Sequence, residues 1–496
     1  MSDAAAAQAT TTDNGHTTGY ETKNYRTYIL LVLMAVYTLN FIDRTLIAVV
    51  APSIIETFGF TDGQWSWIYG PPFALFYAIM GLPIAMWADR ANRVQIIAIC
   101  IVIWSIMTAL CGISAGFWTL LFFRVGVAIG EAGGTPPANS IIGDYFKPTS
   151  RATALGIYSM GVTLGSVLAN LFGGPIAQMK GETFGAWISS IGLGGLFGSL
   201  DWSGVEGWRI AFFIIGLPGI LLAFILLRTV KEPPRGYSDP PGSNKEHSDF
   251  KDAFREIISK PTFWWMAMGA SLVAFVGYGL AGFQAPFLVR IHGLDVRQAA
   301  INYGAPLSAL AALGTFAGGV LTERLSKRSP TAVAWVPAIG LLIATPFYIL
   351  ALMSDNLTLV FVFWGIAAIT HYAYLGAQYN IATGVVSNRA RATAVAVLLI
   401  LVSIIGNGIG PLFVGFFSDV FTANTLSTLD PTGLLSVKSC AAGAIDEAGS
   451  QICTAARSQG LRNSLALTCC WFILAAFCFL MSARTLKRDF VTLQAA

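Results

Sequence analysis

The chain has 496 residues, 55% of them hydrophobic and only 11% charged, with a formal net charge of +4 and a mean hydropathy of +0.65. Because soluble domains carry roughly 25% charged residues, this composition excludes an ordinary soluble protein. The small net charge gives no indication of nucleic-acid binding. The apolar residues come in blocks of about 20, the length that crosses a bilayer core of about 30 Å, so the sequence predicts an all-α membrane protein.

Residues 1–26 lack the basic start and apolar core of a signal peptide, and we expect them to form a disordered cytoplasmic tail. A polar linker rich in Pro, Gly and charge, residues 231–260, divides the remainder into two six-helix halves. The halves are 27–230 and 261–486, and a second cytoplasmic tail covers 487–496. The twelve predicted membrane spans are 27–55, 64–88, 94–114, 117–142, 151–178, 208–229, 261–289, 299–321, 331–353, 357–386, 391–421 and 462–485.

One further stretch is almost long enough to span. Residues 184–200 (FGAWISSIGLGGLFGSL) are rich in Gly and Ser, and we expect an outer loop or a re-entrant hairpin there. The seven cysteines have no metal-ligand spacing, and neither a metal site nor a cofactor is expected. Cys440 and Cys453 share a predicted outer loop, where a disulfide is expected if the loop faces an oxidising compartment.

The basic residues give the orientation. With the N-terminus inside, the predicted cytoplasmic segments hold 21 Lys or Arg and the outer segments hold 7. Because Lys and Arg concentrate on the cytoplasmic side of membrane proteins, this bias places both termini in the cytoplasm. Arg290 is one of the outer residues, and we expect its side chain to extend to the membrane interface.

The two halves repeat each other. The loop ADRANR with Asp89 recurs as TERLSKR with Glu323, which follows Asp89 by 234 positions. The tetrapeptide RATA begins at Arg151 and again at Arg391, 240 positions later. Matched charges at matched loops indicate duplication of a six-helix unit, the arrangement of transporters that rock one half against the other.

These motifs resemble a known family. The loop ADRANR, its copy TERLSKR and the arrangement of six plus six spans are similar to the major facilitator superfamily, although Ala85 and Asn92 stand where that loop usually has Gly. The segments NFIDRTLIAVVAP and FRVGVAIGEAGGTPPANSIIGDYF resemble the spinster family of lysolipid and sphingolipid transporters. The resemblance is good over about residues 25–235 and implies a major facilitator fold with twelve transmembrane helices.

Four charges lie deep within predicted spans: Asp43 and Arg44 in the first, and Arg124 and Glu131 in the fourth. A charge near mid-bilayer costs at least about 2.5–3.5 kcal/mol, so such groups pair or line a wet cavity. Helical rise places Asp43 and Arg124 at the same depth, roughly 20–24 Å from the cytoplasmic edge. If the two spans are neighbours, as the family resemblance implies, Asp43 and Arg124 are expected to pair.

Glu131 follows Arg124 by two helical turns, on the same face and about 10 Å closer to the cytoplasm. We interpret Asp43 and Glu131 as proton carriers, with Arg124 alternately held and released, because pairing and burial alter proton affinity in opposite directions. The alternative is a permanent ion pair that ties the two helices together.

Substrate contacts are expected from other polar residues in the spans. Arg44 is rotated about 100° from Asp43 and is expected to face a central cavity, where it would suit an anionic headgroup. Asn40, Tyr374 and Gln378 are further candidates for substrate binding. His371 is a weaker candidate, because a lone histidine within a span more often bonds between helices.

The loop motifs suggest a conformational gate. The family resemblance implies that Asp89, Arg90 and Arg93 hold a closed cytoplasmic side together, with Glu323 and Arg324 as their counterparts in the second half. The alternative for the basic residues is simple anchoring on the cytoplasmic side.

The function predicted from the sequence is transport. We expect a monomeric, proton-coupled secondary transporter in the cell inner membrane that moves single-chain amphipathic lipids, such as a lysophospholipid or sphingosine phosphate. The alternative is a proton-coupled carrier or exporter of small organic anions or drugs. No HExxH or nucleotide-binding motif is present, so neither an intramembrane metalloprotease nor ATP-driven transport is expected.

Overall fold

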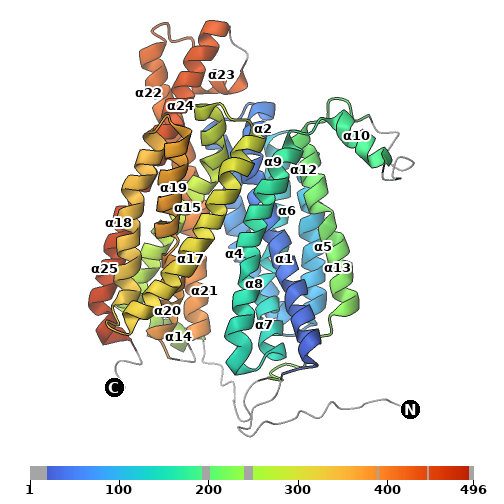
Figure 1. The fold of residues 1–496 in the computed structure, drawn as a ribbon, viewed down its shortest axis with the longest axis vertical. Helices are drawn as coiled ribbons and strands as arrows, with labels where there is room; N and C mark the ends of the chain where they lie inside the picture. Colours follow the sequence, from blue (N-terminus) through green and yellow to red (C-terminus); the bar gives the residue numbers. More distant parts are fainter. Residues whose placement is uncertain are drawn as a thin grey trace.

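The structure is a computed structural model that describes residues 19–190, 192, 201–238, 250–387, 390–443 and 446–490. All regular secondary structure in these residues is helical. The helices run side by side in two bundles, one from each half of the chain (Figure 1). The all-α architecture in two halves expected from the sequence is confirmed.

The first bundle contains the helices of the N-terminal half. They are α1 (Lys23–Val49), α2 (Ala51–Phe58), α3 (Asp62–Tyr69), α4 (Pro71–Ala88), α5 (Arg93–Cys111), α6 (Phe117–Ala132), α7 (Thr135–Tyr145), α8 (Pro148–Leu168), the π-helical η1 (Ala169–Gly173), α9 (Gly174–Ala177), α10 (Gly181–Ser190), α12 (Gly207–Gly216) and α13 (Pro218–Thr229).

The second bundle contains the helices of the C-terminal half. They are α14 (Phe250–Ile258), α15 (Pro261–His292), α16 (Val296–Gln298), the π-helical η2 (Ala299–Gly304), α17 (Ala305–Ser326), α18 (Ala332–Met353), α19 (Leu357–His371), α20 (Tyr374–Gly384), α21 (Arg391–Leu401), the π-helical η3 (Val402–Ile409), α22 (Gly410–Leu429), α23 (Val437–Ala442), α24 (Glu447–Cys469) and α25 (Trp471–Asp489).

Eleven helical stretches of the described chain are long and apolar enough to cross a membrane. The remaining span consists of two shorter helices, α6 and α7, which are separated by Gly133 and Gly134. Gly and Pro also interrupt the second span between α3 and α4, where Gly70 precedes Pro71. Such breaks persist because neighbouring helices satisfy the freed backbone groups.

Some boundaries differ from those expected. The first helix begins at Lys23 with Thr22 as its N-cap, so it takes in the end of the predicted tail, while residues 1–18 lie outside the described part of the chain. The predicted outer loop or hairpin at 184–200 begins as helix α10, which extends away from the bundle (Figure 1). The rest of that stretch, apart from Gly192, lies outside the described residues.

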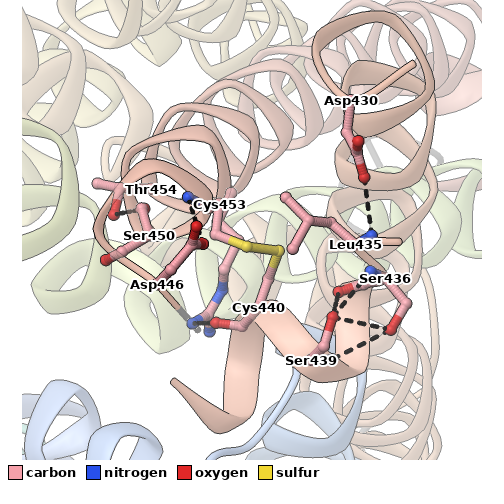
Figure 2. Close-up of a disulfide and its surroundings, with 11 residues drawn as sticks. Asp430, Leu435, Ser436, Ser439, Cys440, Asp446, Ser450, Cys453 and Thr454 are labelled. Atoms are coloured by element: carbon pink, nitrogen blue, oxygen red, sulfur yellow. Dashed lines mark hydrogen bonds between the residues drawn. A yellow bond between two sulfur atoms is a disulfide. The ribbon is translucent and has the colours of Figure 1, made fainter. Parts of the chain in front are cut away.

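The predicted loop after the eleventh span is helical. Cys440 in α23 and Cys453 in α24 form the expected disulfide, with their Cα atoms 5.1 Å apart (Figure 2). The disulfide holds α23 against α24, and the Arg457 guanidinium donates to the carbonyl oxygens of Cys440 (3.3 Å) and Phe60 (3.2 Å). Because Phe60 belongs to the N-terminal half, Arg457 connects the disulfide-bonded cap to both halves.

We call the side of the bundles with α23 the cap side, and the side where α1 begins and α25 ends the terminal side (Figure 1). Asp62 at the start of α3 receives two hydrogen bonds from Arg290 of α15, both 2.8 Å, and one from Ser418 of α22, 2.6 Å. Asp419 accepts the backbone N–H groups of Asp62 and Gly63, at 3.2 and 3.0 Å. These carboxylates satisfy the amide groups that a helix N-terminus leaves free.

We refer to Asp62, Arg290, Ser418 and Asp419 as the cap-side latch. The expectation that Arg290 extends to the membrane interface is wrong, because the side chain turns inward to Asp62, which is only 2% exposed. Among the described residues, the ion pair that joins the two halves lies on this side. Helices α8 and α17 approach each other near the cap side and diverge toward the terminal side (Figure 1). The halves are therefore closed at the cap side.

Replacement of Asp62 by Asn should destabilise the protein strongly. The substitution leaves the Arg290 guanidinium buried without its counter-charge, a change that costs roughly 3–5 kcal/mol in buried ion pairs. Differential scanning fluorimetry in detergent should show a clearly lower Tm. Asp355→Asn is the control, because the Asp355 side chain is 88% exposed where it binds Arg462, and exposed pairs contribute little. Equal Tm values for the two variants would contradict a stabilising role of the latch.

Candidate functional site

The four intramembrane charges gather between α1 and α6. Asp43 and Arg124 are each 3% exposed and Glu131 is fully buried, whereas 20% of the Arg44 side chain is accessible. Two cations and two anions therefore share one region of low dielectric, and Arg44 is its most accessible member.

Arg44 forms the ion pair of this cluster, with its Nε donating to Oε2 of Glu131. The expected pairing of Asp43 with Arg124 is not formed in this structure. Side chains of a helix slant toward its N-terminus, so Arg44 reaches back toward the terminal side, where Glu131 lies two turns beyond Arg124. The sequence spacing gave the depths of the charges well enough to group them. It could not show how far the Arg44 side chain extends along the helix.

Three polar atoms of the cluster have no hydrogen-bond partner among the described residues. They are Oδ1 of Asp43, Oε1 of Glu131 and Nε of Arg124. The other oxygen of Asp43, Oδ2, accepts a hydrogen bond from Thr108 of α5 at 3.3 Å. Buried polar groups are nearly always satisfied, so three unpaired atoms in one cluster are unusual.

Aromatic rings surround the two guanidinium groups. The Arg44 guanidinium carbon lies 4.5 Å from the ring centre of Tyr77 and 5.2 Å from those of Phe41 and Phe73. The Arg124 guanidinium carbon lies 4.9 Å from the ring centre of Phe73. Cation–π contacts stabilise the charges by about 0.5–2 kcal/mol. They leave the guanidinium N–H groups free to donate to an anion.

The other candidates for substrate binding occupy two places. Asn40 is buried on α1, and its side chain lies within hydrogen-bonding reach of Glu131. Tyr374 and Gln378 are buried within the C-terminal half on α20, and Oε1 of Gln378 has no partner among the described residues. His371 is also buried, with its Nδ1 3.2 Å from the Tyr348 hydroxyl, an interhelical contact of α18 with α19. The structure thus places Asn40 in the charge cluster, and Tyr374 and Gln378 in the other half.

The loop motif of the first half folds onto its own bundle. Arg93 is 1% exposed and donates to Asp144 at 2.5 Å, to Glu232 at 2.6 Å, to Ser140 at 2.8 Å and to the Pro233 carbonyl at 2.8 Å. The expectation that Arg93 holds the two halves together does not apply in this conformation. The Arg93 contacts instead fasten the start of the predicted linker to α5 and α7.

The remaining gate candidates are exposed on the terminal side. They are Asp89, Arg90, Glu323 and Arg324. Glu323 lies 3.6 Å from Lys327 of its own helix, in a pair whose side chains are at least 73% exposed. These residues are therefore available for contacts in a conformation in which the terminal side closes.

Several residues of the site carry no signal in the sequence. Thr108, Phe73 and Tyr77 are ordinary residues of apolar helices, and only the packing of α4 and α5 against α6 brings them to the charges. Tyr278 of α15 lies within electrostatic range of Arg44, so the C-terminal half also contributes a residue to the surroundings of the charge cluster. Asp62 had a detectable signal, because a Thr-Asp pair ahead of a helix is typical of an N-cap.

Comparison with known proteins identifies the family. The sequence matches the family model described as Major Facilitator Superfamily over residues 33–411. An MFS-type efflux pump of Mycolicibacterium smegmatis is 30% identical over 391 residues, which cover 79% of this chain and 84% of that protein. Human protein spinster homolog 1 is 27% identical over 419 residues, which cover 80% of this chain and 74% of the human protein.

Solved structures agree with this assignment. A bacterial homolog of the human lysosomal transporter spinster, in an inward-facing and unoccupied conformation, is 55% identical with a TM-score of 0.88, covering 95% of this chain and 99% of that one. Its inward-facing, occupied form has a TM-score of 0.86 at the same identity and coverage. The chain therefore belongs to the major facilitator superfamily and, within it, to the spinster family of transporters.

Proposed function

We propose that this transporter moves single-chain amphipathic lipids with an anionic headgroup, and that protons drive the movement through the Arg44–Glu131 ion pair. The observation that carries the proposal is the position of this pair. Glu131 is fully buried while its cation Arg44 is partly accessible. The same guanidinium group thus meets both a protonatable carboxylate and the space from which a ligand approaches.

Proton binding and substrate binding are linked through Arg44. When Glu131 is ionised, it holds Arg44 in a charge-assisted hydrogen bond. A proton on Glu131 removes the negative charge and releases the guanidinium group, which then donates to a phosphate or carboxylate of the substrate. By thermodynamic reciprocity, an anionic substrate that takes Arg44 also raises the proton affinity of Glu131.

Asp43 and Arg124 provide the second step. Neither is bonded to the other in this conformation, and each has an unpartnered atom. We infer that Asp43 carries a proton here, because an unpaired carboxylate is costly to bury in its charged form. Loss of that proton would draw Asp43 to Arg124 and favour the other conformation, so that protonation is coupled to the movement of the halves.

The chemistry around Arg44 suits a lipid headgroup and chain. Phe41 and Tyr77, both only partly buried, present aromatic surface beside the guanidinium group, which would contact the apolar part of a substrate whose phosphate binds Arg44. Arg binds phosphate in a bidentate manner, a geometry that Lys does not reproduce.

We further propose that the terminal side faces the cytoplasm and that the transporter works as a monomer in the inner membrane. The excess of Lys and Arg on that side supports this orientation. The closed cap-side latch then corresponds to an inward-facing state, the conformation of the 55% identical bacterial homolog.

The pH dependence of substrate binding tests the role of Glu131. The parent protein should bind a lysophosphatidylglycerol more tightly as pH falls, since protonation of Glu131 frees Arg44. Glu131→Gln should bind about tenfold more tightly at neutral pH and lose the pH dependence, because a hydrogen bond to a charged partner contributes roughly 1.5–3 kcal/mol. Microscale thermophoresis of the purified protein measures both, with Glu182→Gln on the exposed face of α10 as the control. A Glu131→Gln protein with unchanged pH dependence would remove Glu131 from the coupling.

Transport in liposomes tests Asp43. Asp43→Asn should abolish acceleration of lysolipid movement by a pH gradient, because the amide cannot release a proton to pair with Arg124. The pH dependence of lysolipid binding, which depends on Glu131, should remain. Unaltered gradient-driven transport in Asp43→Asn would contradict the assignment, and an absence of any gradient effect in the parent would contradict proton coupling itself.

Export of small organic anions or drugs is the second candidate, favoured by the efflux pump that is 30% identical. Competition separates the two functions. A lysolipid and a short-chain phosphate monoester should both require Arg44, but only the lysolipid should gain affinity from the aromatic rings. Tyr77→Ala should therefore weaken lysolipid binding about tenfold or more, as expected from loss of an aromatic contact with the ligand, and leave phosphate binding unchanged. Equal weakening of both ligands would favour the small anion.

A further inference from the structure

A further sequence repeat lies where the halves meet. Tyr69-Gly70-Pro71-Pro72 at the break of the second span recurs as Tyr303-Gly304-Ala305-Pro306 in the eighth, 234 positions later. This is the same interval that separates Asp89 from Glu323. In both places Pro follows the glycine within two positions, in the first turn of α4 and of α17, although α17 continues from η2 without a break.

The fifth and eleventh spans carry a matching pair. Asn170 precedes Gly174-Pro175, and Asn407 precedes Gly410-Pro411, with one residue fewer in between. Asn170 belongs to η1 and Asn407 to η3, both of them π-helical turns within longer helices. Wide turns of this kind are rare and occur mostly at functional sites.

The two pairs meet crosswise between the halves. A Cβ atom on Gly304 would overlap Oδ1 of Asn170. A Cβ atom on Gly70 would lie 2.8 Å from the carbonyl oxygen of Asn407 and 3.1 Å from that of Gly408. Each glycine of one half therefore touches the asparagine segment of the other, and both contacts depend on the missing side chain.

The surroundings fix Asn170 in place. Its Nδ2 donates to the Ser166 carbonyl at 2.9 Å, and the residue is 7% exposed. Beside it, a Cβ atom on Gly174 would lie 2.5 Å from Cβ of Ala300 in η2, so the backbones of α9 and η2 are also close together. Because no space is left between helices packed this closely, a rotation of one helix also moves its neighbour.

We propose that the Gly304–Asn170 and Gly70–Asn407 contacts are the two pivots on which the halves turn, and that Asn170 and Asn407 are positioning residues for transport. The glycines keep the helices in contact, and the irregular helical turns at the same level absorb the change of angle. The proposal requires that the halves turn and is independent of the substrate and of proton coupling.

Spin-label distances test the pivots without a substrate. One label pair, at Ser203 and Thr428, reports the cap side, and a second, at Thr149 and Arg328, reports the terminal side; all four positions are exposed. Cys470→Ser first removes the exposed free thiol. Gly304→Ala should lengthen both distances, because the added Cβ separates the two halves at the pivot itself.

Rescue identifies the partner. The Cβ of Gly304→Ala meets a side-chain atom, so adding Asn170→Ala should restore both distances. The Cβ of Gly70→Ala meets backbone oxygens, so adding Asn407→Ala should not restore them. Gly81→Ala and Gly319→Ala are the matched controls on α4 and α17, because a Cβ atom at either position meets nothing within 4 Å.

Three outcomes would overturn the proposal. They are unchanged distances in Gly304→Ala, an increase of one distance with a decrease of the other, and failure of Asn170→Ala to restore the parent values. A Gly304→Ala protein that does not fold would leave the single variant Asn170→Ala to decide. By removing the contact without adding bulk, Asn170→Ala should broaden both distance distributions, and parent-like distributions would contradict the pivot.

Discussion

The energetic cost of burying charge in an apolar bundle is the constraint on which this structure depends. An ionised side chain near mid-bilayer is expensive unless it is paired. The bundle holds two cations and two anions at one level, yet it forms one ion pair between them, Arg44 with Glu131. Asp43 and Arg124 lie close by without bonding to each other. A cluster in which Arg44 is paired and Arg124 is not can exist in two arrangements of its ion pairs. Binding of a proton to a carboxylate would shift the balance between the two arrangements.

The same principle explains how the two halves are held. The cap-side latch buries Asp62 against Arg290 across the interface between the halves, and Asp419 supports it at the start of α3. The charged loop motifs of the terminal side are exposed, or, in the case of Arg93, bound within one half. Strong contacts on one side and free charges on the other are what an alternating-access cycle requires, since each conformation must exchange one set of contacts for the other.

The sequence predicted the fold and the members of the charge cluster, but not their pairing. Hydropathy, loop charges and the 234-residue repeat depend on local chemistry, so the spans and the halves could be derived. Helical spacing placed Asp43 and Arg124 at one depth, with Glu131 on the same face as Arg124, and the family resemblance made the two helices neighbours. The choice of partner depended on the length and slant of the Arg44 side chain. Thr108, Phe73 and Tyr278 belong to helices that only tertiary packing brings to Arg44 and Asp43. Asp62 and Arg290 are far apart in the chain, and no periodicity relates them.

We propose that binding of the substrate at Arg44 is coupled to protonation of Glu131. Proton uptake during substrate binding tests this coupling most directly. A lysophosphatidylglycerol is added to the purified transporter in weakly buffered detergent, and a pH-indicator dye reports the protons exchanged. We expect the parent protein to take up protons as the lipid binds, and Glu131→Gln to take up none while still binding. Binding by the parent protein without any proton uptake, at a pH where Glu131 is ionised before the lipid is added, would contradict the coupling.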